Sequence, residues 1–307
     1  MLISVCICTF RRPQLLAGLL AALAQQDLKD LGAGVEWVVV DNDPDHSARE
    51  VLEGWNRGAP VFPLRFFHVA QSNISIARNT AVSQARGDWV AFIDDDETPL
   101  ADWLFQLADA QRRFQADAVF GPVVPRYRAD TPDWICQGGY FDRARHKTGT
   151  VIDEADARTG NVLIRTESLR SLPGPFDLSF GRTGGEDSLL FRDLLARQCK
   201  FVWCDEAPVS EEVPQDRATA RWLVKRSFRV GQTWIRGELY RLGPGQRRLR
   251  GGILGSRAAI QLVLSLLFAL LWVIPSRIKA FQWVRVAAMQ AGKLLGMTRF
   301  QYNEYAG

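Results

Sequence analysis

The sequence predicts an α/β fold, with a parallel sheet flanked by helices and a C-terminal helical segment that is apolar and basic. Short, mainly apolar runs occur in the first 93 residues, and segments of helical pattern separate them. Strands that are apolar throughout and alternate with helices are typical of a parallel sheet covered on both faces. Further along, residues 258–276 carry no charge over nineteen positions, which predicts a long apolar helix.

Apolar runs in the sequence predict the strands, and apolar residues at helical spacing predict the helices. Strands are expected at residues 2–9, 35–40, 64–69, 89–93, 118–124 and 161–165. Helices are expected at residues 13–26, 47–55, 74–85, 102–114 and 188–197. The stretch from 125 to about 159 has no regular pattern, and a loop of that length is more often functional than accidental. We expect an α/β domain at 1–230 and a helical segment at 231–307.

The composition excludes several classes of protein. A hydrophobic content of 47% with 23% charged residues allows a full core and excludes a disordered chain. Five cysteines without a CxxC pair predict buried thiols rather than disulfides or a zinc site. The three histidines do not cluster in the sequence, so a histidine metal site is not expected. Residues 1–10 lack the pattern of a signal peptide, so we expect the first domain to stay in the cytoplasm.

Polar side chains follow three of the predicted strands. These are Thr9, Asp41 and the acidic run Asp94–Glu97. Because ligands bind outside the carboxyl ends of parallel strands, we expect these segments to converge on one crevice. Four adjacent carboxylates repel one another, and a hard cation such as Mg²⁺ or Mn²⁺ would neutralise them and bridge to a diphosphate. The alternative is a solvated acidic turn that caps a helix.

Five motifs, taken in their order and spacing, resemble the family 2 glycosyltransferases of the GT-A fold over residues 2–230. They are Ser4–Arg12 (SVCICTFRR), Val38–Asn42 (VVVDN), Ala77–Asn79 (ARN), Gly87–Asp96 (GDWVAFIDDD) and Gly185–Asp187 (GED). Within the family, the chain is most similar to bacterial exopolysaccharide transferases of the succinoglycan type. The fold implied is the Rossmann-like GT-A domain, an α/β fold with a mixed, mostly parallel sheet flanked by helices.

The resemblance implies roles for particular residues. It places Asp41 on the uracil or ribose, Arg78 near the diphosphate, and Asp96 as the principal metal ligand. The Glu186–Asp187 pair matches the ED motif of the family, in which the aspartate is the usual catalytic base. The alternative for Asp187 is an N-cap of the next helix. The residues expected to bind the nucleotide sugar are Thr9, Arg11, Asp41, Arg78, Asp94 and Asp95.

Two departures from the family pattern are visible. Many relatives carry a glycine in the loop where this chain has Gln71–Ile74, which affects the expected fit around the diphosphate. Only Arg221 and Trp222 remain of the Gln-x-x-Arg-Trp motif found in processive members. The resemblance therefore implies transfer of a single sugar.

The C-terminal segment differs in charge from the rest of the chain. From Trp234 onward eleven basic residues stand against two acidic ones, a charge of +9, so the first 233 residues carry −5 of the total +4. Basic residues flank 258–276 on both sides, which opposes a single membrane crossing. We expect a peripheral or monotopic anchor at residues 245–298, with the helix near 281–295 at the lipid headgroups. A true span and a soluble buried hairpin are the alternatives.

Together, the resemblance and the basic apolar segment predict a metal-dependent, inverting hexosyltransferase. It would move a hexose, expected to be glucose, from a UDP-sugar to a lipid-linked oligosaccharide in cell-surface polysaccharide synthesis, on the cytoplasmic face of the bacterial inner membrane. Nucleic acid is not an expected partner, because the apolar content of the segment favours lipid. Trp134, Tyr140 and Arg145 would either contact the acceptor or pack the long loop.

Two other functions remain to be distinguished from it. A sugar-1-phosphate nucleotidyltransferase would need a glycine-rich loop after the first strand, and residues 9–13 contain no glycine. A membrane-associated, non-catalytic protein that binds sugar nucleotides or acts as a scaffold is the second alternative.

Overall fold

The computed structural model describes residues 1–58 and 62–298, and the chain forms two compact units. The α/β unit contains residues 1–126, 143–182 and 186–212. The helical unit contains residues 127–142, 183–185 and the chain from Val213 onward. Residues 299–307 of the expected C-terminal segment lie outside the described residues. The assignment of 1–230 as one functional domain and 231–307 as an anchor remains a proposal.

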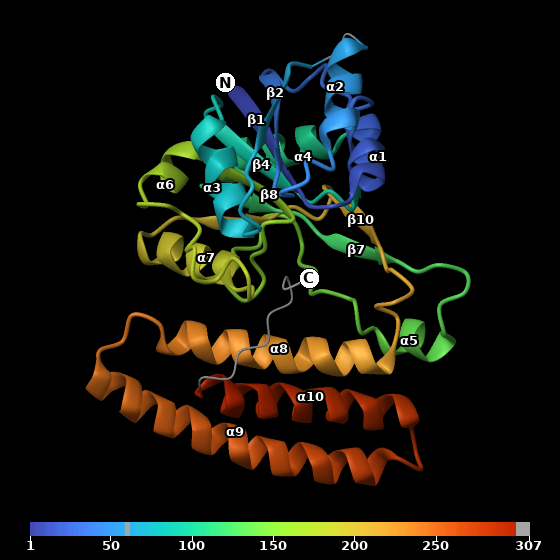
Figure 1. Cartoon of the computed structure of the whole chain (residues 1–307), viewed down its shortest axis with the longest axis vertical. Coiled ribbons are helices and arrows are strands. Elements are labelled where there is room, and N and C mark those ends of the chain that lie inside the picture. The colour runs from blue at the N-terminus through green and yellow to red at the C-terminus, as the bar shows by residue number, and fades with distance from the viewer. Residues whose placement is uncertain (59–61, 299–307) are drawn as a thin grey trace. The chain divides into compact units, whose positions relative to one another are not determined.

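A seven-stranded sheet with the order β3-β2-β1-β4-β8-β6-β9 forms the centre of the α/β unit (Figure 1). Strand β8 is antiparallel to both of its neighbours, β4 and β6, whereas the other pairs are parallel. The mixed, mostly parallel sheet expected from the sequence is therefore confirmed. The strands are β1 (Leu2–Thr9), β2 (Gly34–Asp41), β3 (Leu64–His68), β4 (Trp89–Ile93), β6 (Ala118–Phe120), β8 (Asn161–Arg165) and β9 (Phe201–Trp203).

Helices cover both faces of this sheet (Figure 1). On one face lie α1 (Pro13–Leu23), α2 (Arg49–Arg57) and α4 (Trp103–Phe114). On the other lie α3 (Ile74–Gln84), α6 (Thr166–Arg170) and α7 (Glu186–Ala196). Alternate residues of one strand enter different cores, since Ile7 belongs to the first and Cys6 to the second. This is why the strands are mainly apolar at successive positions rather than at every second one.

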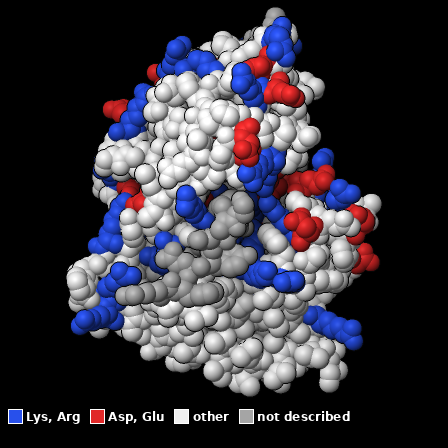
Figure 2. All heavy atoms as spheres, viewed as in Figure 1, with Lys and Arg blue, Asp and Glu red and all other residues white. Residues whose placement is uncertain are grey.

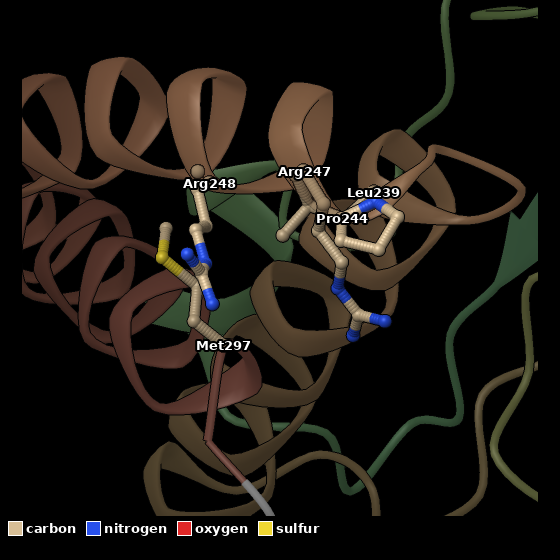
Figure 3. Close-up of a pocket in the computed structure, with 6 residues that line it drawn as sticks. Leu239, Pro244, Arg247, Arg248 and Met297 are labelled. Atoms are coloured by element: carbon tan, nitrogen blue, oxygen red, sulfur yellow. The ribbon is translucent and has the colours of Figure 1, made fainter.

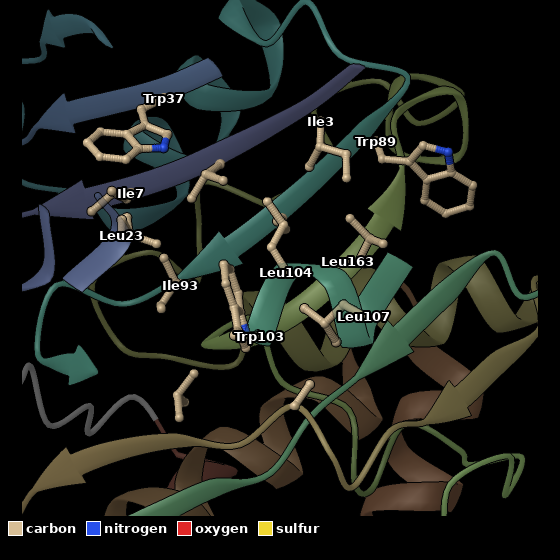
Figure 4. Close-up of a cluster of buried hydrophobic side chains, with 14 of the residues drawn as sticks. Ile3, Ile7, Leu23, Trp37, Trp89, Ile93, Trp103, Leu104, Leu107 and Leu163 are labelled. Carbon is tan, nitrogen blue, oxygen red and sulfur yellow. The ribbon is translucent and has the colours of Figure 1, made fainter. Parts of the chain in front are cut away.

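Tryptophan and leucine side chains from strands and helices fill the first core, between the sheet and α1, α2 and α4 (Figure 4). Trp103 of α4 is fully buried, and its indole Nε1–H donates to Asn161 Oδ1 at 2.8 Å. The bond satisfies the indole donor inside an apolar core. It also joins α4 to the start of β8, next to the strand end that precedes the acidic run.

A small second sheet was not predicted. It has the order β5-β10-β7 and comprises β5 (Glu97–Pro99), β7 (Val123–Arg126) and β10 (Val209–Glu212). The single strand expected at 118–124 is wrong, because the chain leaves the main sheet after Phe120. A Cβ at Gly121 would lie 2.3 Å from the carbonyl oxygen of Ala207, so only glycine fits at this turn.

In its described part, up to residue 298, the helical unit contains a short helix and three long ones. They are α5 (Asp133–Gly138), α8 (Ala220–Leu239), α9 (Pro244–Trp272) and α10 (Arg277–Gly296). Helix α10 packs on both α8 and α9. A Cβ at Gly292 would lie 1.9 Å from the Phe228 carbonyl oxygen, so α10 and α8 pack in backbone contact. Gln290 is only 3% exposed, because α10 packs against both neighbouring helices of this unit.

Among the described residues, one helix, α9, has the length and composition needed to cross a membrane. Only 17% of its most apolar 18-residue stretch is buried, and Leu270 is 71% exposed. In Figure 2 the surface over α9 is a broad area without acidic residues. A soluble buried hairpin would hide these side chains, so that alternative does not fit the structure.

Candidate active site

The three strand ends singled out in the sequence meet at one edge of the main sheet. Thr9 and Asp41 are register partners at the ends of β1 and β2. The Thr9 hydroxyl donates to Asp95 Oδ2 at 2.8 Å, although the two residues are 86 positions apart. Asp94 follows directly on the end of β4. The predicted convergence of these segments is therefore confirmed.

The acidic run Asp94–Glu97 is not a solvated turn. The side chain of Asp95 is 6% exposed and that of Asp96 is 18% exposed, whereas that of Asp94 is 45% exposed. The run leads into strand β5 rather than into a helix, so it caps none. Burial raises the pKa of Asp95 to about 6, although the Arg12 guanidinium acts in the opposite direction. A buried, charged turn of this kind fits a binding role.

Arg12 lies against this acidic run, a contact that the sequence did not indicate. Its Nη1 is 3.2 Å from Asp95 Oδ1 and 2.8 Å from Asp96 Oδ2. The position of Arg12 is set by the turn between β1 and α1, in which Arg11 adopts a left-handed conformation with φ 56°. Such a conformation is uncommon for a residue other than glycine and is often found at functional sites.

Glu97, the fourth carboxylate of the run, points into the protein. Its Oε2 accepts a hydrogen bond from the Asp94 amide at 3.0 Å, and the residue is 2% exposed. Burial raises its pKa well above the usual value, and the Asp94 charge adds to the rise. A Cβ at Gly160 would lie 2.6 Å from Glu97 Oε1, so the pocket around Glu97 is closely packed. Glu97 therefore holds the turn rather than facing a ligand.

A buried ion pair joins the acidic run to the start of α7. Arg78 Nη1 donates to Glu186 Oε1 at 2.6 Å, and Arg78 Nη2 lies 3.4 Å from Asp94 Oδ1. Burial raises the pKa of Glu186 to about 7, against the lowering effect of Arg78. Burial also opposes the charge on Arg78, yet its pKa is raised because Glu186 and Asp94 stabilise the cation. Two matched motifs, far apart in the sequence, are thus in contact.

Asp187 lies next to this pair and is less constrained. Helix α7 begins at Glu186, so Asp187 belongs to its first turn and is not the N-cap. Its Oδ1 accepts the Ser188 amide at 2.7 Å. The residue is half-buried, whereas Glu186 is buried and bound to Arg78. Asp187 is therefore the more accessible carboxylate of the two.

Asp41 and Arg11 lie on the other side of Thr9 and shape a loop. The carboxylate of Asp41 accepts the amides of Asp43 and Ala48, each at 3.0 Å. Arg11 Nε bonds to Asp43 at 3.0 Å, so its side chain is directed away from the acidic run. The structure therefore brings Thr9, Arg78 and the acidic run together, while Arg11 belongs to the loop at 43–48.

The loop at Gln71–Ile74 is held without the glycine common in relatives. Asn42 Nδ2 donates to the Gln71 carbonyl at 2.7 Å, and Asn42 Oδ1 accepts the Asn73 amide at 2.9 Å. Asn73 is extended, with φ −162°, and caps α3 through its side chain. Because no left-handed residue is needed, the departure from the family pattern leaves this loop well fixed.

Across the described residues, no three His, Cys, Asp or Glu side chains form a preformed metal cluster. The oxygen donors of Asp94 and Asp96 nevertheless suit Mg²⁺ or Mn²⁺, because Mg²⁺ is commonly held by one or two carboxylates together with substrate phosphates. The donor set therefore fits a site that a bound diphosphate completes.

The cysteines form no disulfides. All five are free thiols, and two of them, Cys6 and Cys204, are buried.

The aromatic residues of the long irregular stretch pack within the helical unit. Trp134 contacts Phe281 with ring centroids 5.1 Å apart, and the Tyr140 hydroxyl donates to the Ile278 carbonyl at 3.2 Å. Arg145, in the α/β unit, pairs with Asp205 at 2.9 Å. Trp134 and Tyr140 therefore pack the loop, Arg145 forms a surface ion pair, and contact of these residues with the acceptor stays a prediction.

A separate pocket of about 320 Å³ lies in the helical unit (Figure 3). None of the residues that line it is among those predicted to act in catalysis or donor binding. They are Leu239, Pro244, Arg247, Arg248, Gly251 and Met297.

Comparison with known proteins supports the resemblance seen in the motifs. The family model "Glycosyl transferase family 2" matches residues 4–172. The chain is 39% identical to the succinoglycan biosynthesis protein ExoM of Rhizobium meliloti (strain 1021) over 234 residues, 75% of this chain and 73% of that protein. It is 27% identical over 168 residues to a glucosyl-dolichyl phosphate glucuronosyltransferase of Haloferax volcanii, about half the length of each protein.

Solved structures confirm the GT-A fold. The mannosyltransferase PcManGT of Pyrobaculum calidifontis, in complex with GDP-Man and Mn²⁺, covers 96% of this chain and 86% of its own, with a TM-score of 0.64 at 18% identity. TarS 1–349 of S. aureus, in complex with UDP, covers 96% and 91%, with a TM-score of 0.56 at 16% identity. With the family model matching more than half of the sequence, the chain belongs to glycosyl transferase family 2.

Proposed function

We propose that this glycosyltransferase moves a hexose from a UDP-sugar to a lipid-linked saccharide, with inversion at the anomeric carbon, in the synthesis of a bacterial exopolysaccharide. The observation that carries the proposal is the meeting of Thr9, the acidic run and the Arg78–Glu186 pair at one edge of the sheet. The similarity to a succinoglycan biosynthesis protein supports the product class. The UDP complex of TarS supports a UDP-sugar donor, expected to carry glucose.

The donor would bind along the sheet edge. Asp41 and the loop that it holds would receive the nucleoside, and Asp94 would face the ribose. A divalent ion, Mg²⁺ or Mn²⁺, held mainly by Asp96 would offset the charge that develops on the leaving diphosphate. Arg78 supplies a fixed positive charge beside Asp94 for the same purpose. Because Arg78 is buried and paired, its orientation needs no reorganisation during the reaction.

Asp187 would act as the catalytic base. The acceptor hydroxyl has a pKa far above 7, so a carboxylate within about 3 Å must accept its proton as the new bond forms. Asp187 is half-buried, whereas the carboxylate of the neighbouring Glu186 accepts a hydrogen bond from Arg78. We assign Glu186 to the orientation of Arg78 and Asp187 to proton transfer. Attack from the face opposite the diphosphate would invert the anomeric centre.

The helical unit would bind the cytoplasmic face of the inner membrane through residues 245–298. The exposed leucines of α9 supply the apolar surface, and arginines such as Arg247 and Arg277 flank it. Helices with an apolar surface and basic flanks bind at the interface of anionic lipids. Attachment of this kind would give the enzyme access to an acceptor that is itself carried on a lipid.

A panel of UDP- and GDP-sugars tests this function, with purified protein, Mn²⁺ or Mg²⁺ and bacterial glycolipid acceptors. We expect acceptor-dependent release of UDP from one UDP-hexose. Asp187→Asn is expected to lower kcat by about 10³-fold, because a base contributes roughly 10²–10⁴-fold. Asp109→Asn is the matched control, since Asp109 pairs with Arg113 on the surface of α4.

Three outcomes would contradict all or part of the proposal. Absence of UDP release from every donor would exclude a UDP-sugar transferase. An undiminished function of Asp96→Ala in cells would favour the non-catalytic, sugar-nucleotide-binding alternative. Retention of the anomeric configuration in the product would exclude the inverting mechanism alone.

A further inference from the structure

The segment Thr183–Gly185 belongs to the helical unit, although the residues before and after it belong to the α/β unit. Before the segment, the Gly181 carbonyl accepts an amide hydrogen bond from the first residue of α3 at 3.1 Å. After it, Glu186 is bound to Arg78. The segment is therefore anchored at both ends in the α/β unit, and it leads directly to Asp187, the residue proposed as the catalytic base.

Helix α8 of the helical unit holds the segment through two hydrogen bonds and a close contact. Arg236 Nη1 donates to the Thr183 hydroxyl oxygen at 2.6 Å, and the Thr233 hydroxyl donates to the Thr183 carbonyl at 3.2 Å. Arg229 lies against the next residue, since a Cβ at Gly184 would be 3.3 Å from its Nη1. Thr183 is only 6% exposed, so water cannot readily replace these hydrogen bonds if they are removed.

The backbone of the segment does not fix its own position. Gly184 and Gly185 have φ values of 79° and 98°, which glycine adopts without strain, and glycine leaves a chain more conformational freedom than any other residue. Glu186 is held from one side, because Arg78 bonds its Oε1 whereas its buried Oε2 accepts no hydrogen bond from any residue that the structure describes. The contacts from α8 therefore contribute to fixing where α7 begins.

We propose that Thr183 and Arg236 are positioning residues, which hold the segment Thr183–Gly185 on α8 and thereby set the position of Asp187 in the first turn of α7. The inference rests on the proposed role of Asp187 as the base. It gives the helical unit a part in the chemistry besides membrane binding. A displacement of about 1 Å at a reacting group can lower a rate by about 10²-fold, so the rate is sensitive to contacts this close to the base in the chain.

Steady-state kinetics of the full-length protein, with UDP release as the signal, test the inference. Thr183→Val removes the hydroxyl that Arg236 bonds and should lower kcat by about tenfold, with the donor KM and the UDP affinity unchanged. Thr183→Ser keeps the hydroxyl and should recover most of the lost rate. Thr233→Val should lower kcat less. Thr166→Val is the matched control, because its buried hydroxyl donates to the Gly87 carbonyl at 2.7 Å, before β4 rather than after it.

Hydrogen exchange at the Ser188 amide gives a second measurement that needs no substrate. This amide donates to Asp187 Oδ1 at 2.7 Å, so its exchange rate reports on the first turn of α7. Thr183→Val should speed the exchange by about fivefold, the effect expected from one lost hydrogen bond. Thr166→Val should leave it unchanged.

The results distinguish this inference from the proposed function. A loss of kcat in Thr183→Val no larger than in Thr166→Val, or an unchanged exchange rate at Ser188, would overturn the inference. A higher donor KM at unchanged kcat would also overturn it, because the segment would then serve donor binding. If the wild type released no UDP from any donor, the proposed function would be wrong, and faster exchange in Thr183→Val would still show that α8 holds the start of α7.

Discussion

The two units place similar apolar residues in opposite environments. In the α/β unit, Leu104 of α4 is 1% exposed and lies in a core shared with the sheet (Figure 4). In the helical unit, Leu270 of α9 is 71% exposed. Burial of a leucine contributes roughly 1.5–3 kcal/mol to folding in water. The leucines of α9 obtain little of this from the described residues, which is compatible with a membrane-associated segment.

The comparison shows what apolar residues do in each unit. Those of the α/β unit fix the strand ends that carry the acidic run, so they serve the site by holding its geometry. Those of α9 define a surface, and an apolar surface of this extent is typical of a membrane or protein contact. The basic flanks of α9 favour an anionic lipid surface.

A pair of matched truncations is expected to give the largest contrast. Leu104→Ala removes a buried side chain and should lower the free energy of unfolding by about 2–5 kcal/mol, through lost burial and the cavity left behind. Leu270→Ala removes the same atoms from an exposed position and should change it by less than about 1 kcal/mol. Chemical denaturation of both variants in the same detergent measures the difference. Equal losses would show that α9 is buried in the folded protein.

The two units are also expected to differ in how much their exposed leucines contribute to membrane binding. The double variant Leu266→Lys/Leu270→Lys places charges on exposed positions of α9 and should weaken binding to anionic vesicles at least about tenfold, because charged side chains are costly in hydrocarbon. Leu15→Lys/Leu178→Lys makes the same change at two exposed leucines of the α/β unit. Cosedimentation with vesicles of phosphatidylglycerol measures both. Loss of binding in the control as well would assign it to nonspecific charge effects or misfolding.

The smallest expected effect is a change in the stability of the α/β unit with pH. Because the pKa of Glu186 is about 7 in the folded state against an ordinary value of 4.5, the folded protein retains a proton that the unfolded chain releases. Stability should therefore decline as pH rises from about 4.5 to 7. Glu186→Gln should flatten this decline, and Glu53→Gln, at an exposed position on α2, should not. Thermal unfolding across this pH range is the measurement, and equal slopes in wild type and Glu186→Gln would contradict the expectation.

Most of the main sheet was predictable because its strands are apolar on both faces. The strand at 161–165 has the bounds expected, and the first four strands differ by at most a residue at either end. The break after Phe120 was not predictable, because it depends on the close approach of Gly121 to Ala207 from a distant part of the chain. Helix α10 was predicted as a helix, but its position between α8 and α9 was not.

The sequence by itself determined which residues could form the site, because apolar strands ending in Thr9, Asp41 and Asp94 must deliver them to one edge of a parallel sheet. The family motifs added Arg78 and Asp187. Only the tertiary structure decided how the charges are distributed among them. It pairs Arg78 with Glu186, turns Glu97 inward and sets Arg12 against Asp95 and Asp96. Such pairings depend on distances between side chains far apart in the chain, and spacing within a motif contains no information about those distances.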